Sequence, residues 1–134
     1  MAAPTDIILH QASRVLEIVF SDGQAYRLPC EFLRVHSPSA EVRGHGPGQE
    51  VLQVGKRDVT IAAIEPVGTY ALKLVFSDGH DTGLYSWDYL QELGRDQERL
   101  WQRYLERLKE ARASRDPEGP PAPPPAPAAN WKRL

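Results

Sequence analysis

The chain has 134 residues and a formal net charge of −2, with 16 basic and 18 acidic residues. This length suggests one domain, and the near balance of charge gives no support to nucleic-acid binding, which usually requires a clustered basic face. No apolar run approaches the ~20 residues needed to span a bilayer, and the first residues lack the features of a secretory signal. The single cysteine, Cys30, excludes an intrachain disulfide framework and fits a reducing compartment. We therefore expect a cytoplasmic protein that binds neither nucleic acid nor membrane.

The first predicted unit is a strand followed by a hairpin and a short helix. Residues 6–10 predict the strand, and Leu-Glu-Ile-Val-Phe-Ser-Asp-Gly at 16–23 predicts the hairpin. Asp-Gly between apolar runs favours a tight turn, because both residues tolerate positive φ. Pro29 suits the first turn of a helix at 30–35. Ser, Pro and Gly then cluster at 37–48, which predicts a loop.

The second predicted unit repeats the first. Residues 51–54 and 59–64 predict two strands, and Leu-Lys-Leu-Val-Phe-Ser-Asp-Gly follows at 72–79, 56 residues after the first such sequence. Val-Phe-Ser-Asp-Gly is identical in both copies; chance similarity of two amphipathic hairpins is the alternative explanation. Ser86 can cap a helix at 87–93, with Gly94 as its stop.

A third helix is predicted after Asp96, which can cap a segment extending to about residue 113. Its apolar residues fall three and four positions apart and form one stripe, which should pack on the sheet of its own domain. The alternative is a homodimer rather than a monomer, because Trp101 and Tyr104 on this stripe are typical interface anchors.

The composition changes at residue 114, and seven of the twelve prolines lie beyond it. Proline removes backbone donors, and the alanines between offer little area to bury against the ~1–2 kcal/mol entropy of ordering each residue. We therefore expect a folded domain at 4–113 and a disordered Pro/Ala-rich tail at 114–134. Trp131 near its end suggests a docking motif, with an ordinary terminus as the alternative. The predicted fold class is α+β, a small β-rich domain of mainly antiparallel strands with two hairpin–helix repeats and a C-terminal helix.

Residues that could carry chemistry are few. The sequence holds no Gly-rich phosphate loop, Cys-x-x-Cys or His-x-x-x-His. Nothing next to Cys30 in the sequence would activate its thiol, so a small buried residue explains it better. His36, His45 and His80 fall in turns or loops and could gather as ligands of zinc or iron, although a lone loop histidine is usually just solvated. We expect no enzyme activity.

Two segments carry a family resemblance. Residues 76–90 are Phe-Ser-Asp-Gly-His-Asp-Thr-Gly-Leu-Tyr-Ser-Trp-Asp-Tyr-Leu, and residues 28–34 are Leu-Pro-Cys-Glu-Phe-Leu-Arg, followed by a Ser-Pro-Ser loop at 37–39. Over about residues 5–95 the chain resembles the N-terminal domain of γ-butyrobetaine hydroxylase, whose free-standing bacterial form is the domain of unknown function numbered 971. In the hydroxylases this domain precedes a catalytic domain that uses Fe(II) and 2-oxoglutarate. This sequence lacks that domain, so the resemblance argues against hydroxylase activity.

The resemblance also implies a metal site to test. Family members place a Cys-Pro-Cys-x-x-Cys loop beside the histidine of the second turn, and the aligned residues here are Ser37, Pro38, Ser39 and Val42, with His80 retained. Serine hydroxyls do not deprotonate near pH 7, so this set does not suit zinc. Similar domains are fused to Mrp-type ATPases implicated in iron–sulfur assembly, but one cysteine cannot hold a cluster that takes four thiolates.

Two functions are open at this point. The first is a non-catalytic accessory or interaction domain that recruits a protein partner, such as an oxygenase or an iron–sulfur assembly system, through its sheet and tail. The second is a domain that binds a metal or small ligand around His80, with His36, His45 and Cys30 as further candidates.

Overall fold

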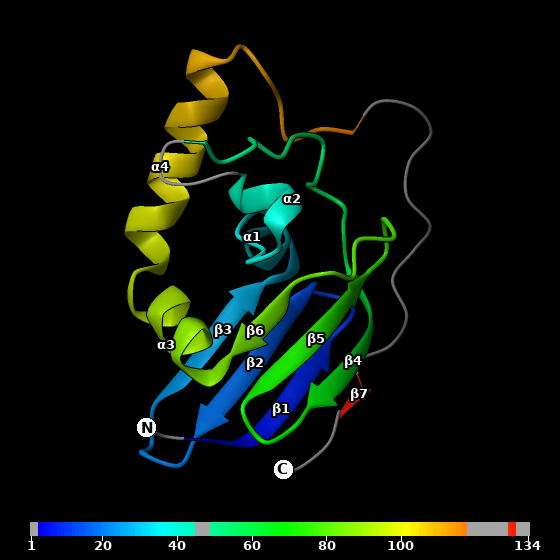
Figure 1. Cartoon of the computed structure of the whole chain (residues 1–134), viewed down its shortest axis with the longest axis vertical. Helices are drawn as coiled ribbons and strands as arrows, with labels where there is room; N and C mark the ends of the chain where they lie inside the picture. The colour runs from blue at the N-terminus through cyan, green and yellow to red at the C-terminus, as the bar shows by residue number, and fades with distance from the viewer. Residues whose placement is uncertain (1–2, 45–48, 118–128, 131–134) are drawn as a thin grey trace.

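Two antiparallel β-sheets form the body of the protein in the computed structural model, which describes residues 3–44 and 49–117 and the backbone of 129–130 (Figure 1). In Figure 1 one sheet lies in front of the other. The first sheet has the order β3-β2-β1-β7 and the second β4-β5-β6. The strands are β1 (Pro4–His10), β2 (Val15–Phe20), β3 (Ala25–Pro29), β4 (Ile61–Val67), β5 (Ala71–Phe76), β6 (Leu84–Ser86) and β7 (Ala129–Asn130).

The core lies between the two sheets and is built by alternation along each strand. On β2, Leu16 and Ile18 are fully buried, and on β5 the same holds for Leu72 and Leu74. Successive strand residues point to opposite faces, so every second apolar side chain enters the core. Each such side chain contributes roughly 1.5–3 kcal/mol when fully buried. The apolar pattern of the two hairpins therefore fixes which face of each sheet turns inward.

The two Ser-Asp-Gly turns are built alike, which confirms both predicted hairpins. In the first turn Gly23 N donates to Phe20 O at 3.0 Å, and the Asp22 carboxylate accepts the backbone N–H two residues on at 2.9 Å. The second turn repeats these bonds at 3.0 and 3.2 Å. Gly23 and Gly79 have φ of 87° and 90°, which glycine adopts without strain. The aspartates thus serve the backbone of the turns.

The similarity of the two halves extends further than the hairpins. Each sheet contributes three consecutive antiparallel strands followed by a helix, α1 (Cys30–Val35) after β3 and α3 (Trp87–Arg95) after β6. The pairing shifts register near the start of both first strands, at 4–6 in β1 and 61–63 in β4. The α+β class, the helix at 30–35 and the helix after Ser86 are confirmed.

The segment between the halves differs from the prediction. The strand expected at 51–54 is wrong, because those residues pair with no strand: Val51 N donates to Val42 O at 2.8 Å, and Gln53 O accepts from the Tyr104 hydroxyl at 2.7 Å. The strand expected at 59–64 begins at Ile61 and continues to Val67. A short helix, α2 (Ala40–Arg43), lies within the predicted loop.

The sequence predicts that Gly94 ends its helix, and this prediction is wrong. Gly94 lies inside α3, where a Cβ would come within 2.4 Å of Cγ in the Tyr26 ring. Gly94 is therefore needed for close approach of α3 to β3. The cap at Ser86 is confirmed, since its Oγ accepts from Tyr89 N at 3.1 Å.

The C-terminal helix α4 (Gln97–Glu110) ends earlier than expected, before Arg112 with its φ of 53°. Its stripe packs on its own domain. Tyr104 and Leu108 are buried against Val35 of α1, and Leu100 and Trp101 pack against the main core. None of the helices in the described ranges is long and apolar enough to cross a membrane.

Ordered contacts continue past the predicted domain boundary at 113. Ser114 O accepts from Gly55 N, and Arg115 O accepts from Arg57 N, both at 2.9 Å. Farther along, β7 pairs with Ile8 and Leu9 of β1. The rest of the predicted tail, including Trp131, lies outside the described residues.

Replacing Gly94 tests its packing role. Gly94→Ala in an ordinary helix interior would stabilise by up to about 1 kcal/mol, but the Tyr26 ring leaves no room here. We expect a loss of about 1–3 kcal/mol in the free energy of unfolding, typical of overpacking, measured by urea denaturation. In a Tyr26→Ala background, Gly94→Ala should no longer lower the free energy of unfolding. An equal decrease in both backgrounds would contradict the explanation.

Candidate functional site

The C-terminal end of α1 positions the candidate site. All six residues of α1 are buried, so its last carbonyl groups need partners inside the protein. Tyr85 donates its hydroxyl to Leu33 O, and Tyr89 donates to His36 O, both at 2.5 Å. Both tyrosines belong to the second half of the chain. They fix the backbone at the point where residues 36–39 leave the helix.

A cluster of two serines and one histidine lies on one side of this point. His80 Nε2 is 2.8 Å from Ser37 Oγ and 3.3 Å from Ser39 Oγ. Its Nδ1 lies 3.4 Å from Glu41 Oε2, and its side chain is 8% exposed. Burial, followed by the charge of Arg34, lowers the pKa of His80. The imidazole is therefore neutral near pH 7, held by hydroxyl groups and one carboxylate.

Gly83 allows this close approach, since a Cβ there would lie 2.4 Å from Ser37 Oγ.

This cluster occupies the place that the family resemblance assigns to zinc. The loop contributes two serine hydroxyls and a buried Val42 where the pattern has thiolates. A zinc ion wants deprotonated sulfur or neutral imidazole in a tetrahedron, and only His80 meets that need. Within the described ranges no group of three His, Cys, Asp or Glu residues could hold a metal ion. These residues therefore do not fit zinc.

Next to the cluster, Asp78 compensates two cations. Its Oδ2 lies 2.9 Å from Arg34 Nε and 2.6 Å from Lys56 Nζ. Burial alone would raise the pKa of Asp78, but hydrogen bonds from Lys56 and the His80 N–H, with the charge of Arg34, hold it below its usual range. Asp78 therefore has two structural roles: it holds the backbone of its turn and it pairs with the two cations.

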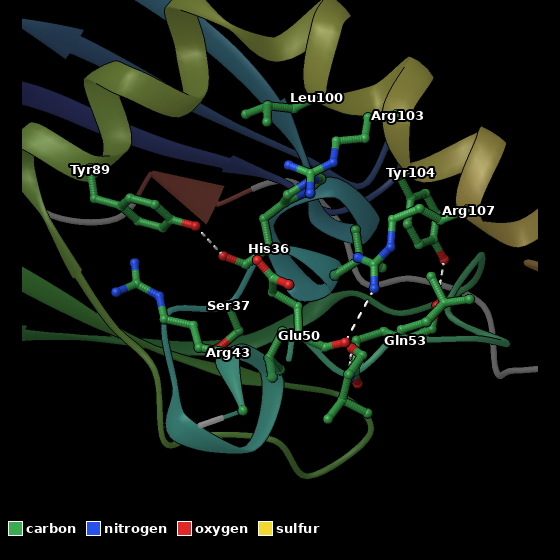
Figure 2. Close-up of a pocket in the computed structure, with 15 residues that line it drawn as sticks. His36, Ser37, Arg43, Glu50, Gln53, Tyr89, Leu100, Arg103, Tyr104 and Arg107 are labelled. Atoms are coloured by element: carbon green, nitrogen blue, oxygen red, sulfur yellow. Dashed lines mark hydrogen bonds between the residues drawn. The ribbon is translucent and has the colours of Figure 1, made fainter. Parts of the chain in front are cut away.

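A cavity of about 580 Å³ lies next to the α1 end, between α2, residues 50–53 and α4 (Figure 2). Its walls combine apolar side chains, among them Val35, Val42 and Leu52, with polar groups at the rim. A concave, mainly apolar surface with a few convergent polar groups is typical of binding sites. Val51 is 52% exposed and extends the apolar surface outward.

Three arginines reach this cavity from two sides. Arg103 and Arg107 come from α4, and Arg43 comes from the end of α2 opposite them (Figure 2). The Arg43 guanidinium lies 5.1 Å from the centre of the Tyr89 ring. Arg107 Nη2 donates to Glu50 O at 3.2 Å. These arginines were not among the residues predicted from the sequence, where the four-residue spacing of Arg103 and Arg107 is the only signal for them.

His36 also lines this cavity, as does Ser37 of the serine cluster. Its Nδ1 donates to Phe32 O at 2.9 Å, and its ring packs edge-on against Tyr104. Burial is the main reason that the pKa of His36 is lowered; the charges of Arg103 and Arg107 add to it, while the bond to Phe32 opposes it. His36 and His80 therefore have separate partners, and His45 lies outside the described residues.

The remaining candidates are built into the domain. Burial raises the pKa of Cys30 to about 11, so its fully buried thiol stays protonated. Tyr104 is 4% exposed, and Trp101 is covered by the Arg115 guanidinium 4.9 Å from its ring centre. Arg115 in turn makes two bonds to Glu31, at 2.8 and 2.6 Å.

Comparison with known proteins decides the family. Residues 7–91 match the family described as "Gamma-butyrobetaine hydroxylase-like, N-terminal". The chain belongs to this family. The match runs from Ile7 of β1 through β6, includes the serine–histidine cluster, and confirms the resemblance seen in residues 28–39 and 76–90.

Solved structures of similar chains agree with this membership in the γ-butyrobetaine hydroxylase-like N-terminal family. Two solution NMR structures are 52% and 54% identical, each with a TM-score of 0.76; they cover 90% and 91% of this chain, and 94% and 91% of their own. A crystal structure from Acidithiobacillus ferrooxidans, described as a protein of unknown function of the DUF971 family, is 40% identical, with a TM-score of 0.57 over 68% of this chain and 91% of its own. No curated protein matches the chain.

Metal content tests the donor set of this γ-butyrobetaine hydroxylase-like domain. We expect the purified protein to contain no stoichiometric zinc by elemental analysis, because neutral hydroxyls are poor zinc ligands. Ser37→Cys/Ser39→Cys should gain zinc, since two thiolates would then face His80. Adding His80→Ala to that variant should reduce the zinc content. Stoichiometric zinc in the unaltered protein that disappears with His80→Ala would contradict the prediction.

The pH dependence of stability tests His36. Its lowered pKa means that the unfolded state binds more protons as pH falls below the usual histidine value of about 6.5, so acid should destabilise the fold. His36→Asn keeps a donor near Phe32 but cannot titrate. Between about pH 7.5 and 5.5, the Tm of the variant should fall less than the Tm of the unaltered protein. An equal loss in both proteins would exclude this contribution.

Proposed function

We propose that this chain is a non-catalytic accessory domain of the cytoplasm that binds a protein partner through the cavity between α2 and α4, here called the α2–α4 cleft. The observation that carries the proposal is the combination in one concave surface of apolar walls, an exposed Val51 and three arginine side chains. Exposed apolar residues beside convergent polar groups are typical of interaction sites rather than of ordinary surface.

The state of the chemically versatile side chains supports a non-catalytic role. The Cys30 thiol is buried and protonated, whereas nucleophilic cysteines have lowered pKa values and access to solvent. His80 is bonded to Ser37 and Ser39, and the aspartates of both hairpins hold their turns. The groups named here are thus used to hold the fold.

Family membership supports the kind of partner. The domain resembles the part of γ-butyrobetaine hydroxylases that precedes their catalytic domain, so an oxygenase or a cofactor-assembly enzyme is the partner class we propose. The alternative of a metal site at His80 has weaker support, because its donors are hydroxyl groups.

Matched surface variants test this proposal. Val51→Glu places a charge on the exposed apolar rim of the α2–α4 cleft, while Leu84→Glu changes a similarly exposed residue, 47% accessible, on β6 away from it. Affinity purification of the tagged chain, with quantitative mass spectrometry, should recover a partner whose yield falls at least tenfold with Val51→Glu and is unchanged with Leu84→Glu. Equal recovery with both variants, or no partner at all with the unaltered chain, would overturn the proposal.

A further inference from the structure

The α2–α4 cleft carries an excess of positive charge that the fold leaves uncompensated. Among the described residues that line it, Glu50 supplies the one carboxylate, against the guanidinium groups of Arg43, Arg103 and Arg107. In the described part of the chain none of these three arginines forms an ion pair with a carboxylate. Other arginines of the domain do so, as Arg34 and Arg115 show.

The arrangement of α4 brings like charges together. Arg103 and Arg107 are four residues apart, so they lie on one face of the helix, where like charges repel. His36 responds to both of them, since each of the two charges lowers its pKa. The positive potential therefore reaches into the cavity instead of being spread over the outer face of the helix.

Two of the three arginines are also held in place. The ring of Tyr89 supports Arg43, and Glu50 O accepts one N–H of Arg107. A guanidinium group has five N–H donors in a fixed plane, so donors are left over on both residues. Arginine suits planar, two-pronged binding of a carboxylate better than lysine does.

We propose that the α2–α4 cleft binds an acidic segment of a partner protein, with carboxylates on Arg103 and Arg107 and a neighbouring apolar side chain on the Val42 and Leu52 wall. This inference rests on the proposed function and names the chemistry of the partner. A peptide suits the cleft better than a small anion. A small anion would leave the apolar wall and Val51 in contact with water, whereas an apolar side chain of a peptide would cover them.

Titration of the full chain followed by NMR amide shifts tests the inference. The probe is a capped hexapeptide of alternating Glu and Leu, and its control carries Gln in place of Glu. Succinate and inorganic phosphate are titrated separately. Arg103→Gln/Arg107→Gln removes the cleft charges, and Arg99→Gln/Lys109→Gln removes the same charge from exposed positions of α4 outside the cleft.

We expect the Glu peptide to give saturable shifts at residues 35–37, 42–44, 50–53 and 100–107, with a dissociation constant below ~1 mM. Arg103→Gln/Arg107→Gln should weaken binding at least tenfold, Arg99→Gln/Lys109→Gln less than twofold, and the Gln peptide should bind at least tenfold more weakly.

Several outcomes would overturn the inference. Succinate or phosphate binding in the cleft as tightly as the Glu peptide would identify a site for small anions. Self-association of the chain that depends on Arg103 and Arg107, measured by sedimentation, would identify a second copy as the occupant. If no probe causes localised shifts, the cleft does not bind an acidic ligand. Partner recovery that falls with Val51→Glu but not with Arg103→Gln/Arg107→Gln would remove this inference and leave the proposed function standing.

Discussion

The buried C-terminal end of α1 is the constraint on which the rest of the structure depends. A helix of six residues has little stability by itself, and all six residues of α1 are buried, so its last carbonyl groups need partners within the protein. The hydroxyls of Tyr85 and Tyr89 satisfy Leu33 O and His36 O; leaving a buried acceptor without a partner costs about 1–3 kcal/mol. The first half of the chain thus needs the second half to complete its own helix.

This dependence explains why two unlike environments lie so close together. Tyr89 bonds His36 O through its hydroxyl and supports Arg43 with its ring, so one side chain shapes the α2–α4 cleft. Ser37, which follows His36 in the chain and also lines the cleft, bonds His80 of the second hairpin turn. Small shifts of α1 would therefore change the cleft and the serine–histidine cluster together.

The sequence predicted what local chemistry determines and failed where distant residues decide. Asp-Gly between apolar runs defines a hairpin by itself, so both turns were found. Gly94 resembles a helix stop, but the Tyr26 ring, remote in sequence, is the reason for it. An apolar–polar pattern at 51–54 suits a strand, yet its backbone groups are bonded by α4 and α2. The cleft arginines belong to separate helices, and only the folded chain brings them together.

The hydrogen bonds between His80 and the two serines have a consequence for how the domain is made. Where the family pattern would join the two halves through an ion, uncharged groups of the chain itself join them here. Such bonds are made by side chains that the chain itself supplies as it folds. None of the three side chains is a thiol, so oxidants of cysteine do not act on these bonds.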